Sequence, residues 1–276
     1  SVAENDGLPT WEEASAWTED KLYFWHRHLE ITTTAMVGHP AWPAGLVYLD
    51  LFAGAGVCTM KQSRRRIPGS VLLAAQTSKP FSRIIACEKD RTLADACETR
   101  LSKTYVAARS HVLRGDCNEL VDQIVELMIP GALTLAFVDP KGLDAQFSTI
   151  TALSRNGRVD FVALFADAYD INRNVELYYR NNPDSKLDQV LGPSSDWRSK
   201  LDQLPNQSGL EKRRLFARIY EEQLRQQLGY THFRHKPMSG PNGPLYTLVY
   251  ASKHDLGLNF WDKAISKDAT GQRELF

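Results

Sequence analysis

Several features that mark other protein classes are missing from this chain of 276 residues. It has no excess of charge of either sign, because 33 Lys and Arg balance 33 Asp and Glu. No overall field therefore attracts it to nucleic acid or to an anionic membrane. It also lacks an apolar run of the ~20 residues that a membrane span needs, and its N-terminus has no signal-peptide core. We expect a soluble protein with no membrane partner, in which any site for a polyanion is local.

Cysteine is sparse as well. The four cysteines, Cys58, Cys87, Cys97 and Cys117, are far apart in the sequence. None of them has the close spacing of a zinc site or a redox pair. We predict reduced thiols that act as small buried side chains in a cytoplasmic protein, and no metal site built on them.

The chain does have enough apolar residues for a full core, at 43% of its length. Short apolar runs alternate with helical patterns from about residue 46 to residue 165, which is typical of βαβ units and a parallel sheet. The expected strands are 46–51, 83–88, 109–114, 132–138 and 159–165. The expected helices lie near 69–78, 90–103, 117–128 and 145–155, and Pro68-Gly69-Ser70 begins the first of them.

The segments on either side of this unit complete the predicted fold. Residues 11–36 look helical, whereas residues 167–209 are polar and lack a long apolar period, as in an inserted lid. A long helix follows at Leu210–Leu228 and ends at Gly229. Two strands then flank a turn-rich loop, at Tyr230–Lys236 and Leu245–Ala251, and we expect them to pair antiparallel.

Together these elements predict an α/β, doubly wound, Rossmann-like class I methyltransferase fold. Its seven-stranded sheet is mainly parallel with an antiparallel last strand. We divide the chain into an N-terminal helical extension, 1–40, and a methyltransferase-like domain, 41–276, which carries the insertion 167–209.

The most informative motif is Asp50-Leu51-Phe52-Ala53-Gly54-Ala55-Gly56, which follows the apolar run 46–49. A strand that turns through two near-adjacent glycines brings bare backbone against a ligand. The dinucleotide fingerprint needs a third glycine where this chain has Thr59, which weakens an NAD or FAD assignment. The Walker Gly-Lys-Ser/Thr ending is replaced by Gly56-Val57-Cys58, which excludes that type of ATP site.

Acidic residues follow successive predicted strands at the edge where a doubly wound sheet binds its ligands. Each suits one part of S-adenosylmethionine (SAM). Gly54 and Gly56 approach the methionine portion with Asp50 near its ammonium, Glu88 accepts from the ribose hydroxyls, and Asp116 accepts from the adenine amino group. We assign the neighbouring Phe52, Lys89 and Cys117 to the same cofactor pocket, together with Asp139. At any single position, a helix cap or a solvated turn is the alternative interpretation.

Asp139-Pro140-Lys141-Gly142 ends the fourth strand, where a methyl acceptor would enter. Base-amino methyltransferases resemble one another in an Asp/Asn-Pro-Pro-aromatic tetrad that holds a flipped base, but this chain has no aromatic residue in that loop. It also lacks the nucleophilic cysteine of cytosine-C5 enzymes. Asp139 is the candidate base or orienting group, and Lys141 is a second candidate that could meet an acceptor anion.

Two further sets of residues are candidates for acceptor binding. Five residues after the fifth strand could shape the acceptor pocket: Asp167, Tyr169, Asp170, Asn172 and Arg173. Three basic clusters, at 64–66, 212–214 and 234–236, make nucleic acid a candidate partner despite the zero net charge.

The chain resembles the three-Cys-motif partner proteins, a bacterial family with a methyltransferase-like fold. The matching motifs are Lys21-Leu22, 50–56, Gly115-Asp116-Cys117-Asn118, Phe137-Val138-Asp139-Pro140-Lys141-Gly142, 245–254 and Phe260-Trp261-Asp262-Lys263. They extend over nearly all of the chain except 167–209. The resemblance implies an associated protein with a three-cysteine motif, and it implies no particular substrate.

The leading hypothesis is a SAM-dependent methyltransferase of unknown acceptor, either nucleic acid or a small molecule. A second hypothesis is a metal-dependent nuclease or phosphodiesterase with a divalent cation held by Asp50, Asp116 and Asp139. The third is a non-catalytic partner protein that keeps the fold as a binding module, which the incomplete tetrad favours.

Overall fold

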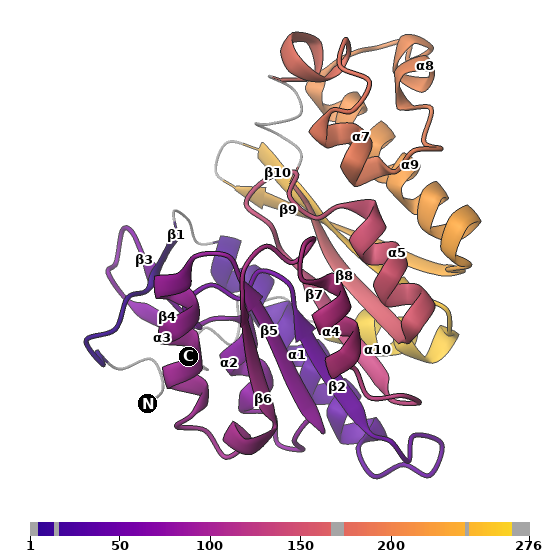
Figure 1. Cartoon of the computed structure of the whole chain (residues 1–276). Coiled ribbons are helices and arrows are strands. Elements are labelled where there is room, and N and C mark those ends of the chain that lie inside the picture. Colours follow the sequence, from indigo (N-terminus) through magenta and orange to yellow (C-terminus); the bar gives the residue numbers. More distant parts are fainter. Residues whose placement is uncertain (1–4, 14–16, 167–173, 241–242, 267–276) are drawn as a thin grey trace.

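A seven-stranded sheet forms the centre of the molecule (Figure 1). The computed structural model describes residues 5–13, 17–166, 174–240 and 243–266. Across the sheet, the strand order is β6-β5-β2-β7-β8-β10-β9, and β10 runs antiparallel to both of its neighbours. The strands are β2 (Leu46–Asp50), β5 (Arg83–Glu88), β6 (Ser110–Arg114), β7 (Leu133–Val138), β8 (Arg158–Ala166), β9 (His232–Gly240) and β10 (Gly243–Ser252). The class I methyltransferase fold predicted from the sequence is confirmed.

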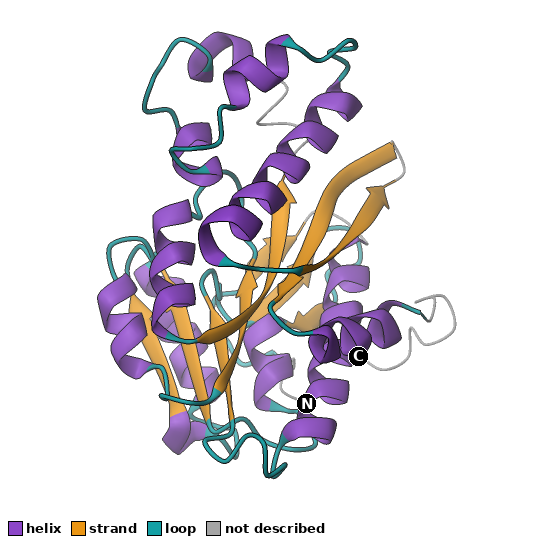
Figure 2. Cartoon of the chain, turned by 90° about the vertical axis from the view of Figure 1, so that its right-hand side faces the viewer, coloured by secondary structure: helices purple, strands orange, loops and turns teal. Residues whose placement is uncertain are grey.

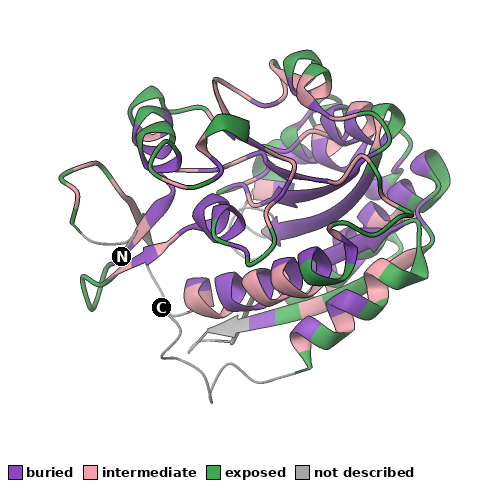
Figure 3. Ribbon diagram, turned by 90° about the horizontal axis from the view of Figure 1, so that it is seen from below, coloured by how far each residue is buried: buried purple, intermediate pink, exposed green. Residues whose placement is uncertain are grey.

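Helices cover both faces of this sheet, because its strands are apolar on both sides (Figure 2). The first face carries α1 (Trp17–Met36), α2 (Ser70–Ala75), α3 (Arg91–Leu101) and α10 (Asp255–Ile265). The second carries α4 (Val121–Leu127), α5 (Phe147–Asn156) and α9 (Gly209–Leu228). The short helix η1 (Ala107–Arg109) leads into β6. Figure 3 shows the inner strands as buried between these layers, whereas the edge strands β6 and β9 are partly exposed. The core consists of two apolar clusters separated by the sheet.

A small second sheet lies beside the glycine motif. It has the order β1-β3-β4, with β1 (Trp11–Glu13) parallel to β3 (Val57–Met60), and β3 antiparallel to β4 (Arg66–Pro68). The prediction of a helix from residue 11 was wrong for residues 11–13, because these residues pair with a strand that is distant in the sequence. The prediction that the next helix starts at Pro68-Gly69-Ser70 is confirmed by α2.

The inserted segment is more ordered than its composition indicated. Within 174–209 the chain forms the π-helix η2 (Val175–Tyr179), α7 (Lys186–Leu191) and α8 (Trp197–Asp202). Four of its apolar side chains are buried in the core on the α9 face: Leu187, Leu191, Trp197 and Leu201. Each short helix contributes only two or three apolar residues to the core, which is why the sequence of this part shows no long apolar period.

The two C-terminal motifs of the family resemblance have structural roles. Tyr250 of β10 and Trp261 of α10 stack with ring centroids 5.3 Å apart, and His28 of α1 contacts both rings.

Gly229 ends α9 in the left-handed conformation, at φ 74°. In the ranges that the structure describes, no helix combines the length and the apolarity required to cross a membrane.

Candidate functional site

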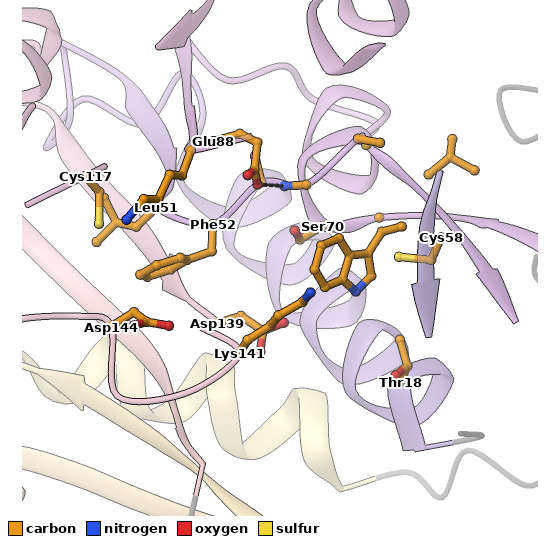
Figure 4. A pocket seen from close by; sticks show the side chains of 18 of the residues that line it. Thr18, Leu51, Phe52, Cys58, Ser70, Glu88, Cys117, Asp139, Lys141 and Asp144 are labelled. Atoms are coloured by element: carbon orange, nitrogen blue, oxygen red, sulfur yellow. Dashed lines mark hydrogen bonds between the residues drawn. The ribbon is translucent and has the colours of Figure 1, made fainter. Parts of the chain in front are cut away.

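A cavity of about 240 Å³ lies at the carboxyl ends of β2, β5, β6 and β7 (Figure 4). This is the edge at which a doubly wound sheet binds its ligands. The cavity brings together nearly all of the predicted site residues, which are Phe52, Gly54, Gly56, Glu88, Lys89, Asp116, Cys117, Asp139 and Lys141. Asp50 is the predicted site residue that does not line it.

The glycine loop forms one wall of the cavity. Gly54 and Gly56 have φ values of 59° and 79°, in the left-handed region where a side chain is strained. The Ala53 amide donates to the Cys87 carbonyl at 3.0 Å, and the Gly69 amide donates to the Gly56 carbonyl at 2.8 Å. The loop is thus held to β5 at one end and to the start of α2 at the other, with its backbone along the cavity.

Glu88 is held at the end of β5 by two backbone amides. Its Oε2 accepts from the Gly54 amide at 2.8 Å, which Figure 4 marks with a dashed line, and its Oε1 accepts from the Asp90 amide at 2.8 Å. A carboxylate oxygen has more than one lone-pair direction, so both oxygens can still accept from a ligand. The side chain links the glycine loop to the cavity.

Asp116 and Cys117 line the same cavity after β6. Asp116 accepts from the Lys89 ammonium at 3.0 Å, and from the backbone and side-chain nitrogens of Asn118 at 2.9 and 2.8 Å. Burial raises the pKa of the Cys117 thiol and raises that of Cys87 to about 12. Both thiols are therefore protonated at neutral pH, which agrees with the predicted role of these cysteines as small buried side chains.

Asp50 lies beneath the cavity, fully buried at the end of β2. It accepts from the hydroxyls of Tyr48 and Ser70 at 2.9 and 2.5 Å, and from the Phe52 amide at 3.2 Å. Burial raises its pKa to about 6, against the lowering effect of these hydrogen bonds. Ser70 itself lines the cavity, so Asp50 supports the site through Ser70 and the loop backbone.

Asp139 follows β7 and forms an ion pair that the sequence did not suggest. The Lys21 ammonium of α1 donates to Asp139 Oδ2 at 2.5 Å, and both residues line the cavity. The side chain of Lys21 is only 4% exposed and that of Asp139 is 18% exposed. The sequence held one indication of this buried pair, because Lys21 directly precedes the apolar stretch 22–25 of the predicted helix.

The N-terminal segment closes the cavity on the side of the glycine loop. Trp11 of β1 lines the cavity, and the Lys141 ammonium lies 3.6 Å from the centroid of its ring system. Arg100 of α3, which is 2% exposed, holds this segment through Asp6 and the Leu8 and Pro9 carbonyls. The same guanidinium donates to the Ala55 carbonyl of the glycine loop at 2.7 Å. No sequence motif connected Trp11 to the site.

The three acids of the metal hypothesis do not form a ligand set. In the part of the chain that the structure describes, no three His, Cys, Asp or Glu side chains are grouped so that they could hold a metal ion. The oxygens of Asp50 face Tyr48, Ser70 and the Phe52 amide. The arrangement of these acids does not favour the nuclease hypothesis.

The basic clusters are largely neutralised within the chain. Arg65 pairs with Glu19, and Arg66 with Asp6. The other two clusters pair in the same way, through Lys212–Glu176, Arg214–Glu211, Arg234–Asp262 and His235–Glu221. These contacts give no support to a nucleic-acid interface. The predicted acceptor residues at 167–173 lie outside the described residues.

No protein-family model matches this chain, and no curated protein matches it. Cofactor-bound Rv0187 from MTB is similar in structure, with a TM-score of 0.50 and 12% identity over 92% of this chain and 87% of its own. The O-methyltransferase from Bacillus cereus in complex with SAH has a TM-score of 0.49 and 11% identity; the match covers 91% of this chain and 87% of that protein. TomG from Streptomyces achromogenes, an O-methyltransferase in complex with SAM, has a TM-score of 0.45 and 14% identity; the match covers 87% of this chain and 81% of TomG. At these identities the likeness is one of fold.

Proposed function

We propose that this chain is a SAM-dependent methyltransferase of unidentified acceptor. The observation that carries the proposal is that the glycine loop and the acids at the carboxyl ends of β5, β6 and β7 all line one cavity at the ligand-binding edge of the sheet. These acids are Glu88, Asp116 and Asp139. The strand order and the antiparallel β10 are those of the class I methyltransferase fold.

The residues of the cavity fit this cofactor. Gly54 and Gly56 offer backbone without side chains to the methionine portion, and Ser70 stands next to this loop with Asp50 behind it. Glu88 has the acceptor oxygens for two ribose hydroxyls, and Asp116 can accept from the adenine amino group. Each contact uses a group that already lines the cavity.

When bound, SAM supplies a methyl group on a sulfonium whose leaving group is a neutral thioether. The chain then has to orient the acceptor and take its proton. Asp139 is the candidate for both roles, because Lys21 fixes its Oδ2 and thereby directs the carboxylate into the cavity. The wall formed by Thr18, Leu22 and Trp11 would hold the acceptor against it.

Isothermal titration calorimetry with SAM and with S-adenosylhomocysteine (SAH) tests the proposal. We expect both ligands to bind at sub-millimolar levels with one site per chain. If neither ligand binds, the proposed function is wrong. Incubation with a pool of candidate acceptors and a labelled methyl donor would then identify the acceptor, and cofactor binding without transfer to any acceptor would favour the non-catalytic alternative.

We also propose membership of the three-Cys-motif partner family, on the motifs that the sequence shares with it. In support, residues 115–118 and 137–142 line the cavity or adjoin it, and Tyr250 and Trp261 belong to the core. Co-expression with a protein that carries a three-cysteine motif, followed by size-exclusion chromatography, tests the implied partner. Separate elution of the two proteins would contradict it.

A further inference from the structure

The position of Trp11 in the cavity is fixed by its surroundings. In β1, Trp11 is the parallel partner of Cys58 in β3, and Arg100 anchors the residues that precede it. A Cβ atom built on Gly54 would lie 3.8 Å from the Trp11 Cβ, in ordinary contact. The indole therefore begins directly over the glycine loop.

The indole face already holds a cation. The Lys141 ammonium is 3.6 Å from the centroid of Trp11, well within the ~6 Å range of a cation–π contact. Lys141 comes from the loop after β7, two residues beyond Asp139. Trp11 thus lies where the glycine loop and the acceptor loop approach one another, and it attracts positive charge at that point.

This inference rests on the proposed function. If the methionine portion of SAM lies along Gly54 and Gly56, and the acceptor meets Asp139, then the sulfonium has to lie between these two walls. Of the two aromatic side chains along the described cavity wall, Trp11 and Phe52, Trp11 is the one whose ring already contacts a cation. We infer that the Trp11 indole binds the sulfonium of SAM by a cation–π interaction, and that Lys141 leaves the ring face when the cofactor enters.

The consequence is selectivity between the two forms of the cofactor. SAM carries a positive charge at sulfur, whereas SAH is a neutral thioether, so a cation–π contact favours SAM alone. Trp11 is then a specificity-determining residue that retains the methyl donor and releases the product. Lys141 competes with SAM for the ring and has no such effect on SAH.

Calorimetric titration of SAM and SAH into three variants tests this inference. Trp11→Leu removes the aromatic face, and Trp11→Phe keeps a weaker one. Trp42→Leu is the matched control, because Trp42 also contacts a cation, Arg158 at 5.4 Å, but does not line the cavity. We expect Trp11→Leu to lower the ratio of SAM to SAH affinity about fivefold or more, Trp11→Phe to lower it less, and Trp42→Leu to leave it unchanged.

A fourth variant keeps the inference testable if Trp11→Leu fails to fold. Lys141→Met removes the competing cation, and we expect it to raise the affinity for SAM relative to SAH. An unchanged affinity ratio in Trp11→Leu, or an equal loss for both ligands, overturns the role of the indole while leaving the proposed function in place. Failure of SAM and SAH to bind the unmodified chain overturns the proposed function itself.

Discussion

At the level of single residues, Glu88 contributes to the site in two ways. Its carboxylate is the candidate ribose acceptor, and it also holds the Gly54 and Asp90 amides at 2.8 Å each. A ligand bound to Glu88 would therefore find the glycine loop already in position. This arrangement predicts that changes to the charge and changes to the length of this side chain have different effects.

Replacing Glu88 with Ala should weaken SAH binding by ~1.5–3 kcal/mol, the range for hydrogen bonds to a charged group. Glu88→Gln keeps the length of the side chain and one acceptor oxygen, so it should lose less. Calorimetry measures both variants, with the exposed Glu126→Ala of α4 as the control. Unchanged affinity in Glu88→Ala would place the ribose elsewhere.

The residues that could be predicted from the sequence are those within a motif at a strand end. The glycine loop, Glu88, Asp116 and Asp139 follow apolar runs, and the parallel topology brings their positions to one edge. Trp11 and Lys21 reach the same cavity from the N-terminal segment. Their proximity depends on how β1 and α1 dock on the sheet, and no local pattern encodes that docking.

At the level of elements, one buried side chain contacts both the segment that leads into β1 and the glycine loop. Arg100 donates to Asp6 at 2.8 and 2.9 Å, to the Pro9 carbonyl at 2.8 Å and to the Ala55 carbonyl at 2.7 Å. The Arg100 hydrogen bond holds the pKa of Asp6 well below its usual range. The segment that leads into β1 and the glycine loop therefore share Arg100 as a common hydrogen-bond donor.

Arg100→Met should loosen both elements together. Because truncating one partner of a buried ion pair leaves the other unpaired, we expect the free energy of unfolding to fall by about 3 kcal/mol. Amide hydrogen exchange in residues 5–13 and in the glycine loop should accelerate, and SAH affinity should fall. Arg91→Met at the exposed start of the same helix is the control. Faster exchange in only one of the two segments would contradict a shared anchor.

Elements with a strong local pattern were predictable, and elements that depend on distant partners were not. The five parallel strands were found because they are short, mostly apolar runs between turn residues, and the closing antiparallel pair was found because it flanks a turn-rich loop. The hairpin of β3 and β4 was missed, since its strands are three and four residues long and one partner is β1. The helices of 174–209 were missed because their apolar residues belong to a core completed by α9.

At the scale of the whole molecule, charge is balanced locally as well as overall. The equal totals of basic and acidic residues reflect pairs such as Arg66–Asp6 and Arg234–Asp262, at 2.8 and 3.0 Å. Pairs of this kind reduce the charge that the three basic clusters can offer to phosphates. Electrostatic attraction to a polyanion should therefore be weak.

We expect a fluorescent 20-nucleotide single strand to show no binding at tens of micromolar protein in 150 mM salt. Fluorescence anisotropy at 50 and 200 mM salt measures this directly. A protein that contacts several phosphates loses affinity steeply over that range. Saturable binding with such a steep salt dependence would restore nucleic acid as the acceptor class.

The stability of the whole chain should also depend on pH through buried groups that act in opposite directions. Burial raises the pKa of Asp160 to about 6, although Tyr250 donates to it at 2.9 Å. Because the folded chain binds this proton more tightly than the unfolded chain, protonation of Asp160 stabilises the fold. This contribution to the free energy of unfolding is complete below the unfolded pKa of ~3.9 and is lost as the pH rises through about 6. Burial lowers the pKa of His28 to about 3, so His28 costs stability as the pH falls below ~6.5.

Because these slopes oppose one another, the comparison of a variant with the unmodified chain is more informative than either curve alone. Asp160→Asn removes the carboxyl titration and keeps a side chain of the same shape beside Tyr250. Between pH 4.5 and 7.5, the difference in unfolding free energy between the two proteins should change by about 2 kcal/mol, with the variant relatively more stable at the higher pH. Urea denaturation across this range measures the change. A constant difference would mean that Asp160 has the same pKa in the folded and unfolded chains, and that the core beneath α10 admits water.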